Sequence, residues 1–557
     1  MPTLDWIGKS AVLNHHRQVP YRLLHCNREL SAGDPDAGNL LVQGDNLEAL
    51  KALLPYYAGK VKCIYIDPPY NTGNEGWAYN DNVNSPEIRQ WLRQTVGKEG
   101  EDLSRHDKWL CMVYPRLALL RDFLTEDGAI FVSIDDNEVH HLLACLDDVF
   151  GPERRLAIFT WVRKKKGSNL SKEFRKITEY VVAYKRSAKK LELFGIPAYA
   201  EKQVPLLNRA NPESSLHFPA GIVRVGSRMQ DGRIEAGMFG KGELTVLLRE
   251  PICVRNGVVE SAFELIGRWR WSQDTVDDEL ACGSVFTLSK DFRVNVARYN
   301  QANKFKAPSS LLSPDDGIGT NEDATDELRA MFPDEVRLPF DFPKPVSLVQ
   351  YLVRALCRDD RQAVVLDSFV GTGTTGHAVL AQNKADGGTR RFILVEMDEA
   401  ICQNVTAQRL RKAIEGYGDT PGLGGGFRYC KLGNPLFDEA GNIAGEVRFA
   451  DLAAHVFFTE TGSPIPKRAD GRMPLLGVHQ GKAVYLLFNG VLGDRRPAGG
   501  NVLTHEVAHD LPAHPAANKS SKGGPRVVYG EACRLGPKSL HHYGITFRQI
   551  PFELKVD

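Results

Sequence analysis

Asp67, Pro68, Pro69 and Tyr70 form the stretch of this chain with the clearest chemical potential. They follow residues 61–66, an apolar and partly β-branched run that predicts a buried strand. Two successive prolines cannot continue a ladder, because each lacks an N–H and has a fixed φ. A carboxylate, unclaimed backbone carbonyls and an aromatic ring suit the amino group and flat ring of a purine turned out of a duplex. The alternative is a simple strand-to-loop turn with a surface tyrosine.

A second corner of this kind lies about 300 residues later. An apolar strand over 364–366 is followed by a glycine-rich turn and then a helix. Gly371 and Gly373 let backbone N–H groups approach a ligand at the helix N-terminus. A further strand ends in Glu396, where an acidic group binds the hydroxyls of a ribose.

The glycine turn is compatible with more than one cofactor. Its G-x-G-x-x-G spacing matches the dinucleotide fingerprint, so an NAD-dependent oxidoreductase is an alternative. A Walker A loop is disfavoured, because His377 stands where the phosphate-binding lysine belongs. Asp367 suits an ammonium better than a pyrophosphate. S-adenosylmethionine therefore fits, with its ammonium near Asp367, its ribose on Glu396 and its adenine near Asp45. Asp45 has an equally good interpretation as a helix N-cap.

The elements between these corners alternate between strand and helix. This βαβ rhythm predicts an α/β fold with a parallel sheet and helices on both faces. The rhythm breaks over 190–310, where short strands alternate with Gly- and Pro-rich turns. We therefore expect an N-terminal arm (1–35), a catalytic half (36–189), an inserted domain (190–310), a cofactor-binding half (311–429) and a small C-terminal α/β domain (430–557).

Two basic stretches are candidates for contact with nucleic acid. The segment 161–176 is the densest positive cluster, and it is either a solvated face or a phosphate-binding surface. Residues 268–271 read Arg-Trp-Arg-Trp. Alternating arginine and tryptophan can bind the phosphate backbone of a nucleic acid and stack on its bases. In a strand, however, both tryptophans would share one face and belong to the core. The candidate DNA-binding residues are Arg163, Lys164, Lys165, Lys166, Arg268 and Arg270.

Composition sets broader bounds. The 557 residues are 42% hydrophobic and carry a net charge of +1, so any nucleic-acid surface must be local. We expect no membrane span, because no apolar run approaches the roughly 20 residues that a span needs. The ten cysteines are scattered without a C-x-x-C pair, which fits a reducing compartment, so we expect a cytoplasmic location. His505-Glu506-Val507-Ala508-His509 matches a zinc-protease pattern, but nothing else indicates proteolysis, so we expect a chance helix face and no metal site.

Taken together, these motifs resemble the amino-methyltransferases of DNA. The Asp-Pro-Pro-Tyr sequence resembles their catalytic motif, and Phe-Val-Gly-Thr-Gly, beginning at Phe369, resembles their cofactor motif. Their order resembles the circularly permuted β-class of adenine-N6 enzymes, and the wider sequence resembles the modification (Mod) subunit of type III restriction–modification systems. The segments GDNLEAL and FPKPVSLVQYL resemble flanking motifs of that class.

The resemblance implies a Rossmann-like methyltransferase sheet and specific roles. Asp67 and the Pro68 carbonyl would hold N6 of a flipped adenine in double-stranded DNA, and Tyr70 would stack on the base. Residues 190–310 would recognise the target sequence, a homodimer is expected, and a separate helicase–nuclease subunit would be a partner. The alternatives are the NAD-dependent enzyme and a catalytically silent DNA-binding subunit; cytosine-N4 specificity also stays open. The expected S-adenosylmethionine-binding residues are Asp45, Lys344, Asp367, Phe369, Gly371, Gly373, Thr374 and Glu396.

Overall fold

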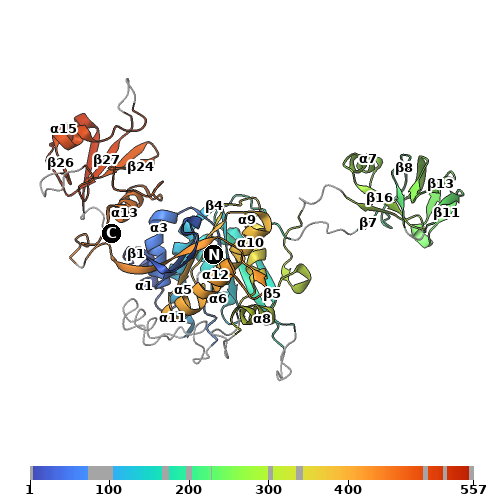
Figure 1. The fold of residues 1–557 in the computed structure, drawn as a ribbon, viewed down its shortest axis with the longest axis horizontal. Coiled ribbons are helices and arrows are strands. Elements are labelled where there is room, and N and C mark those ends of the chain that lie inside the picture. The colour runs from blue at the N-terminus through green and yellow to red at the C-terminus, as the bar shows by residue number, and fades with distance from the viewer. Residues whose placement is uncertain are drawn as a thin grey trace. The chain divides into compact units, whose positions relative to one another are not determined.

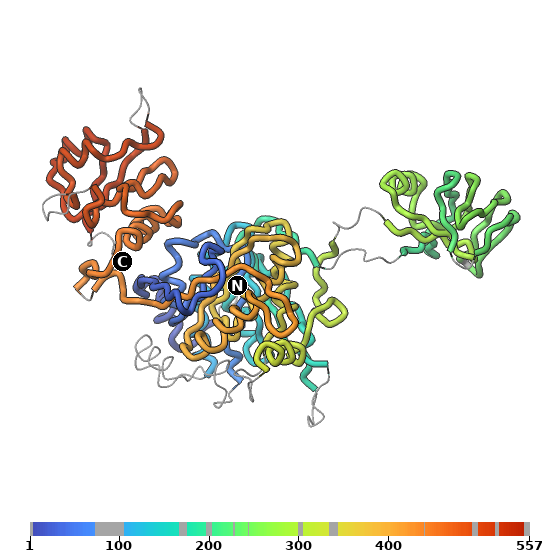
Figure 2. The backbone as a smooth tube through the Cα atoms, in the orientation of Figure 1, coloured from blue at the N-terminus to red at the C-terminus, as the bar shows by residue number. Residues whose placement is uncertain are grey.

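The chain forms two compact units in a computed structural model. The first comprises Met1–Leu193 and Ser309–Asp557, and the second is the intervening Phe194–Pro308 (Figures 1 and 2). The second unit therefore falls within the 190–310 segment in which the βαβ rhythm breaks. The structure describes residues 4–72, 105–165, 175–195, 203–226, 229–298, 305–333, 343–438, 440–492, 500–517 and 523–550.

A ten-stranded sheet organises the described part of the first unit. Neighbouring strands from β23 to β4 are parallel, whereas β1 joins β23 antiparallel and β6 joins both β4 and β5 antiparallel. Strands from the two ends of the chain interleave, so that β19 lies directly beside β3. The order across the sheet is β1 (Arg22–Gly33), β23 (Gly426–Pro435), β2 (Leu40–Gln43), β20 (Arg391–Glu396), β19 (Val364–Asp367), β3 (Val61–Ile66), β4 (Leu124–Ile134), β6 (Thr178–Lys185), β5 (Arg155–Val162) and β18 (Leu311–Leu312).

Both faces of this sheet are covered. Ile64 and Ile66 of β3 share a hydrophobic core with helices α3, α5 and α6. The alternate residues Cys63 and Tyr65 are also buried, and the Cys63 thiol contacts Cys357 of α9. A sheet with a parallel centre that is buried on both faces is typical of a Rossmann-like α/β fold. The predicted fold class is therefore confirmed. The principal helices are α3 (Asn46–Tyr57), α5 (Arg105–Phe123), α6 (Val139–Phe150), α8 (Asn321–Met331), α9 (Val346–Cys357), α10 (Thr374–Asp386) and α12 (Ala407–Glu415).

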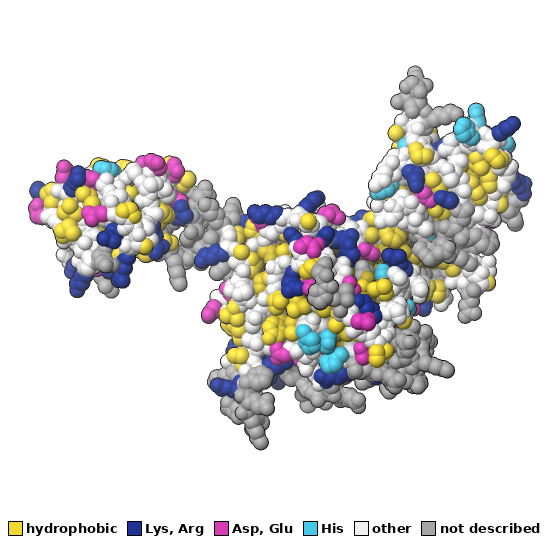
Figure 3. All heavy atoms as spheres, turned by 180° about the vertical axis from the view of Figure 1, so that it is seen from behind, with side chains coloured by type: hydrophobic (Ala, Val, Ile, Leu, Met, Phe, Trp, Pro, Cys, Tyr) yellow, Lys and Arg dark blue, Asp and Glu magenta, His cyan; other side chains and the backbone are white. Residues whose placement is uncertain are grey.

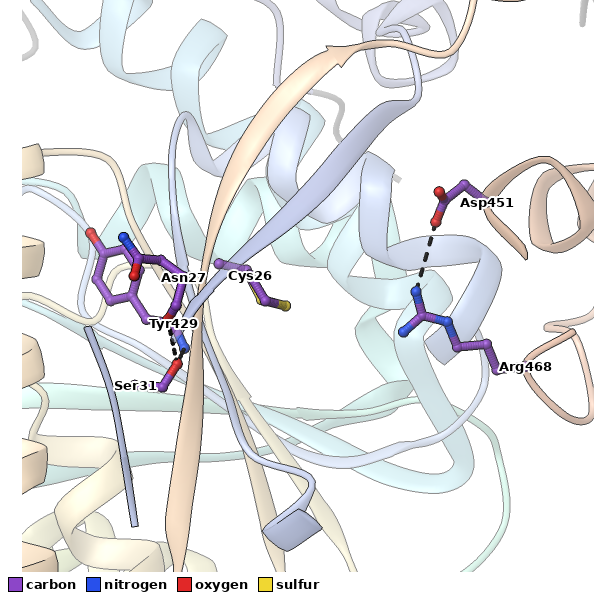
Figure 4. Close-up of a disulfide and its surroundings, with 7 residues drawn as sticks. Cys26, Asn27, Ser31, Tyr429, Asp451 and Arg468 are labelled. Carbon is purple, nitrogen blue, oxygen red and sulfur yellow. Dashed lines mark hydrogen bonds and ion pairs between the residues drawn. A yellow bond between two sulfur atoms is a disulfide. The ribbon is translucent and has the colours of Figure 1, made fainter. Parts of the chain in front are cut away.

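Much of the segment expected to be an N-terminal arm belongs to the sheet. β1 pairs with β23, and Cys26 lies directly opposite Cys430, to which it is joined by a disulfide (Figure 4). Ser31 of β1 also accepts a hydrogen bond from the backbone N–H of Tyr429 at 3.0 Å. The two cysteines are 404 positions apart, so local cysteine spacing gave no indication of this bridge.

The described part of the second unit is built mainly from antiparallel strand pairs, with β16 parallel to β9, and one α-helix. Its strands form a seven-stranded and a four-stranded sheet that enclose a separate hydrophobic core. Trp269 belongs to that core. The elements are β7 (Val204–Pro205), β8 (Glu213–Phe218), β9 (Arg224–Val225), β10 (Gly232–Ile234), β11 (Gly237–Phe239), β12 (Val246–Leu248), β13 (Ile252–Arg255), β14 (Val258–Val259), β15 (Phe263–Arg268), α7 (Gln273–Ala281), β16 (Val285–Leu288) and β17 (Val294–Ala297).

The C-terminal part of the first unit has its own four-stranded sheet and core. Its order is β24-β25-β27-β29, which agrees with the small α/β domain expected here. No helix among the described residues is long and apolar enough to cross a bilayer. The elements are α13 (Phe449–Thr461), β24 (Leu475–His479), β25 (Lys482–Leu486), β26 (Val502–Leu503), α14 (His505–Asp510), β27 (Arg526–Gly530), β28 (Ala532–Cys533), α15 (Pro537–Tyr543) and β29 (Ile545–Gln549).

Candidate active site

The Asp-Pro-Pro-Tyr corner leaves the sheet at the carboxyl end of β3. Pro68, Pro69 and Tyr70 are all buried, while Asp67 is partly exposed. The indole Nε1–H of Trp109, on α5, donates a hydrogen bond to the Pro69 carbonyl at 2.6 Å. The prolines and this hydrogen bond together restrict the corner, so that Asp67 and Tyr70 are held in place before any ligand arrives.

Asp67 is paired with a lysine from the other half of the chain. Lys344 Nζ lies 3.0 Å and 2.8 Å from the two carboxylate oxygens of Asp67, and 4.9 Å from the centre of the Tyr70 ring. Burial opposes the charge on Lys344, but the carboxylates of Asp67 and Glu179 more than offset this effect and raise the pKa of Lys344. Lys344 is therefore a buried cation that contacts both Asp67 and Tyr70 of this corner.

Glu179, on β6, is a central residue of this corner that the sequence analysis missed. Its Oε2 accepts a hydrogen bond from the Tyr70 hydroxyl at 3.3 Å, and its Oε1 accepts one from Arg163 Nη1 at 2.6 Å. Lys344 Nζ lies 3.7 Å from Oε2. A signal existed: Glu179 alternates with the apolar residues Val181 and Ala183 along its strand, so its charged side chain is expected to face the interior.

The glycine-rich turn lies beside this corner, because β19 is the neighbour of β3. Gly371 and Gly373 have φ values of +50° and +89°, the left-handed region that glycine adopts without strain. Asp367 accepts hydrogen bonds from the Phe369 N–H at 2.9 Å and the Thr375 hydroxyl at 2.5 Å. Burial nevertheless raises the pKa of Asp367 to about 7.

Asp67 and the glycine-rich turn line the same pocket. The two corners therefore meet in space, although they are far apart in the sequence. Arg409 of α12 supports the wall of this pocket, since its Nη1 donates to the hydroxyls of Thr372 and Thr374 at 2.8 and 2.9 Å. The lining residues are Tyr65, Asp67, Pro343, Lys344, Asp367, Phe369, Val370, Gly371, Thr372, Thr374 and Thr375.

Two expected cofactor residues, Glu396 and Asp45, are not among those lining the pocket and make hydrogen bonds within the protein. Glu396 accepts hydrogen bonds from the N–H groups of Gly371, at 3.0 Å, and Asp398, at 2.9 Å. Asp45 caps α3 by accepting from two backbone N–H groups, and Arg116 Nη2 lies 3.1 Å from its other oxygen. Asp45 therefore has the geometry of a helix N-cap, one of the two roles that its sequence position allowed. A direct cofactor contact by either carboxylate stays a prediction.

The expected DNA-binding residues divide between the two units. Arg163 turns inward to Glu179, Lys165 pairs with Asp323 at 2.6 Å, and Lys166 lies outside the described residues. In the second unit Arg268 and Arg270 are exposed, whereas the tryptophan between them is core. Basic and acidic side chains are interspersed on the visible face in Figure 3, in agreement with the small net charge.

The protease-like histidines do not form a metal centre with a third ligand among the described residues. His509 is 84% exposed and lies beside Asp510, and buried His514 lies 3.0 Å from the Gly481 carbonyl oxygen. The metal-ligand cluster that the described residues do contain is His106, Glu138 and His141. It was not expected from the sequence.

Comparison with known proteins links this site to a family. The model of the DNA methylase family matches residues 61–408. The chain is 30% identical over 417 residues to the type III restriction-modification enzyme StyLTI Mod subunit of Salmonella typhimurium, covering 73% of this chain and 60% of that protein. It is 31% identical over 443 residues to the EcoPI Mod subunit of Escherichia phage P1, covering 73% and 65%. The matches thus span less than two thirds of either Mod subunit.

A solved structure was also matched. The M1.HpyAVI–SAM complex aligns with 66% of this chain and 98% of its own chain, at 13% identity and a TM-score of 0.30.

Proposed function

The chain belongs to the DNA methylase family, since the family model matches more than half of it, and we propose that it transfers a methyl group from S-adenosylmethionine to an amino group of a DNA base. One observation carries the proposal. The Asp67 corner and the glycine-rich turn line one pocket, so a cofactor on the turn and a base at the corner would be neighbours. When bound, S-adenosylmethionine supplies an electrophilic methyl group.

The residues of the corner have distinct tasks in this proposal. Asp67 and the Pro68 carbonyl accept hydrogen bonds from the amino group of a flipped base and orient its nitrogen towards the cofactor. The Tyr70 ring stacks on the base. Because the methyl group is already activated, the protein needs no covalent nucleophile, and most of the acceleration comes from alignment. The glycine turn and Asp367 hold the cofactor, with Asp367 facing its ammonium.

Lys344 must yield to the substrate base. Its ammonium is within hydrogen-bonding distance of both oxygens of Asp67 and lies over the Tyr70 ring, the two groups that a base would contact. Base entry therefore requires Lys344 either to share the carboxylate or to withdraw towards Glu179, whose Oε2 is 3.7 Å from Nζ. Until then Lys344 neutralises a carboxylate that would otherwise be partly buried without a cation.

We further propose N6 of adenine in double-stranded DNA as the acceptor, on the basis of the Asp in the Asp-Pro-Pro-Tyr motif. The two relatives named above are type III Mod subunits, which supports a role as the modification subunit of such a system. That role includes a homodimer, a separate helicase–nuclease partner and a cytoplasmic site of action. The second unit, Phe194–Pro308, is the natural candidate for target recognition, since it is inserted between the two halves that form the pocket.

Transfer of tritium from labelled S-adenosylmethionine to DNA tests the activity. Asp67→Asn keeps the shape of the side chain but removes the charge, so we expect methyl transfer to fall by roughly 10²- to 10³-fold while cofactor affinity changes little. Asp127→Asn is the matched control: Asp127 also pairs with a lysine, but it is 62% exposed at the start of β4. Normal transfer by Asp67→Asn would contradict the assigned role.

The same assay separates the alternatives. A silent DNA-binding subunit would incorporate no methyl group in the wild type. An NAD-dependent enzyme would be stabilised against heat by NAD rather than by S-adenosylmethionine. Digestion of the product DNA to nucleosides and mass spectrometry would then identify N6-methyladenine or N4-methylcytosine.

A further inference from the structure

His106, Glu138 and His141 form a compact cluster behind the catalytic corner, and none of them lines the cofactor pocket. His106 Nδ1 lies 2.6 Å from Oε1 of Glu138, and His141 Nδ1 lies 2.7 Å from Oε2. The Glu138 side chain is completely buried, whereas His106 and His141 are 36% and 20% exposed. The cluster thus opens to solvent on its imidazole side.

Local structure explains why the three side chains converge. Glu138 directly precedes α6 as its N-cap residue, and His141 follows three positions later on the same face of that helix. His106 lies in the first turn of α5, which packs against α6. The geometry is therefore fixed by two packed helices rather than by a loop.

We propose that this cluster binds a divalent transition-metal ion of the zinc class. The potential ligand atoms lie within 4.8 Å of one another. Zinc takes nitrogen and carboxylate ligands at about 2.0–2.2 Å, which places tetrahedral ligands about 3.4 Å apart, so small side-chain movements close the site. Two imidazoles and one carboxylate favour zinc or its neighbours over Mg²⁺ or Ca²⁺, which prefer oxygen ligands. The ion also supplies a counter-charge to the buried Glu138.

The ion would act on the catalytic corner through Asn71, the residue that follows Tyr70. The Asn71 side-chain amide donates to Oε1 of Glu138 and to the Arg105 carbonyl, the latter at 3.2 Å. Asn71 has φ of +55°, a left-handed conformation that costs energy for a residue other than glycine and is maintained by such contacts. Fixing Glu138 thus fixes the exit of the corner. The role is structural, and it does not depend on methyl transfer.

Calorimetric titration of the full chain with ZnCl₂, after treatment with EDTA, tests the site. We expect His106→Gln and His141→Gln each to weaken binding of one equivalent by at least about tenfold. His140→Gln is the matched control, because His140 is exposed and its ring is tilted against that of His141, with ring centres 4.0 Å apart, but it is not a member of the cluster. Co²⁺ should give a visible d–d absorption band that both ligand variants lose.

Two further arms make the result decisive. His505→Gln/His509→Gln removes a histidine pair elsewhere in the chain, on α14, and should leave the titration unchanged; loss of zinc binding in that variant alone would overturn the proposal. Zinc should also raise the melting temperature of the wild type, and Mg²⁺ should not. Equal zinc binding by the wild type and by both ligand variants would contradict the proposal, because the three side chains would then form only a hydrogen-bonded cluster. Because His106 and His141 are partly exposed, we expect their glutamine variants to fold. Thermal melting of each variant without metal checks this.

Discussion

Lys344 and Asp67 stand 277 positions apart in the chain, yet the ammonium of one lies 2.8 Å and 3.0 Å from the two carboxylate oxygens of the other. This ion pair joins the catalytic half of the sheet to the cofactor half. It also occupies the groups proposed to receive the base. The pair therefore has a structural role in the free protein and must rearrange during catalysis.

Lys344→Met should destabilise the protein, because it leaves the carboxylates of Asp67 and Glu179 close together without this cation. Removing one partner of a buried pair costs about 3–5 kcal/mol, and unfolding in urea would measure the loss. Lys344→Arg should recover part of it. The control Lys165→Met removes an exposed lysine that pairs with Asp323, and it should change stability by less than about 1 kcal/mol. Equal stabilities of Lys344→Met and wild type would contradict this account.

Asp367 should make stability depend on pH. Burial raises its pKa in the folded state from 3.8 to about 7, so the folded protein holds a proton that the unfolded chain releases. The resulting stabilisation is complete below about pH 4 and is lost as the pH rises to about 7. Asp367→Asn removes this contribution, and the difference between wild-type and variant unfolding free energies should therefore change across that range. A constant difference would refute the buried, protonated carboxyl group.

Gly373→Ala should weaken binding of S-adenosylmethionine. Gly373 has φ of +89°, and an added Cβ would lie 3.3 Å from Thr406 Cγ2. The substitution thus strains the turn that faces the pocket. Gly387→Ala is a strict control, because Gly387 also has a positive φ, of +67°, but has open space around the Cβ position at the other end of α10. Calorimetry should show a loss of affinity only for Gly373→Ala, and a similar loss in both would indicate a general effect on folding.

Arg270→Gln should weaken DNA binding through loss of a phosphate contact. Each such contact contributes about 0.9 to the slope of log affinity against log salt concentration, so the slope should decrease by about that amount. Arg233→Gln is the control: Arg233 is 64% exposed in the same unit but pairs with Glu235. Fluorescence anisotropy at several salt concentrations would measure both. An unchanged slope for Arg270→Gln would remove this residue from the proposed DNA surface.

The sequence was informative where chemistry and local structure coincide. Successive prolines after an apolar strand, and glycines after another, predicted two turns at the same edge of a parallel sheet, and β3 and β19 are indeed neighbours. Pairings between distant positions left no comparable signal. The ion pair of Lys344, the contacts of Glu179 and the antiparallel pairing of β1 with β23 all depend on tertiary structure.

For Asp45 the sequence predicted two roles and could not decide between them. Its position at the end of a strand fits both a cofactor contact and an N-cap, because both require a short acidic side chain just before a helix. Only the structure reveals the two backbone N–H groups that it caps and its ion pair with Arg116. Local pattern alone could not separate these roles.

The inserted unit has one consequence for how such proteins diversify. The Gly195 N–H donates to the Lys306 carbonyl at 2.8 Å, so the outgoing and returning segments run side by side. An entire module can therefore be exchanged at this paired stem without altering the register of any strand in the ten-stranded sheet. In the proposed function, such an exchange would change the preferred DNA sequence and leave the residues around the pocket unaltered.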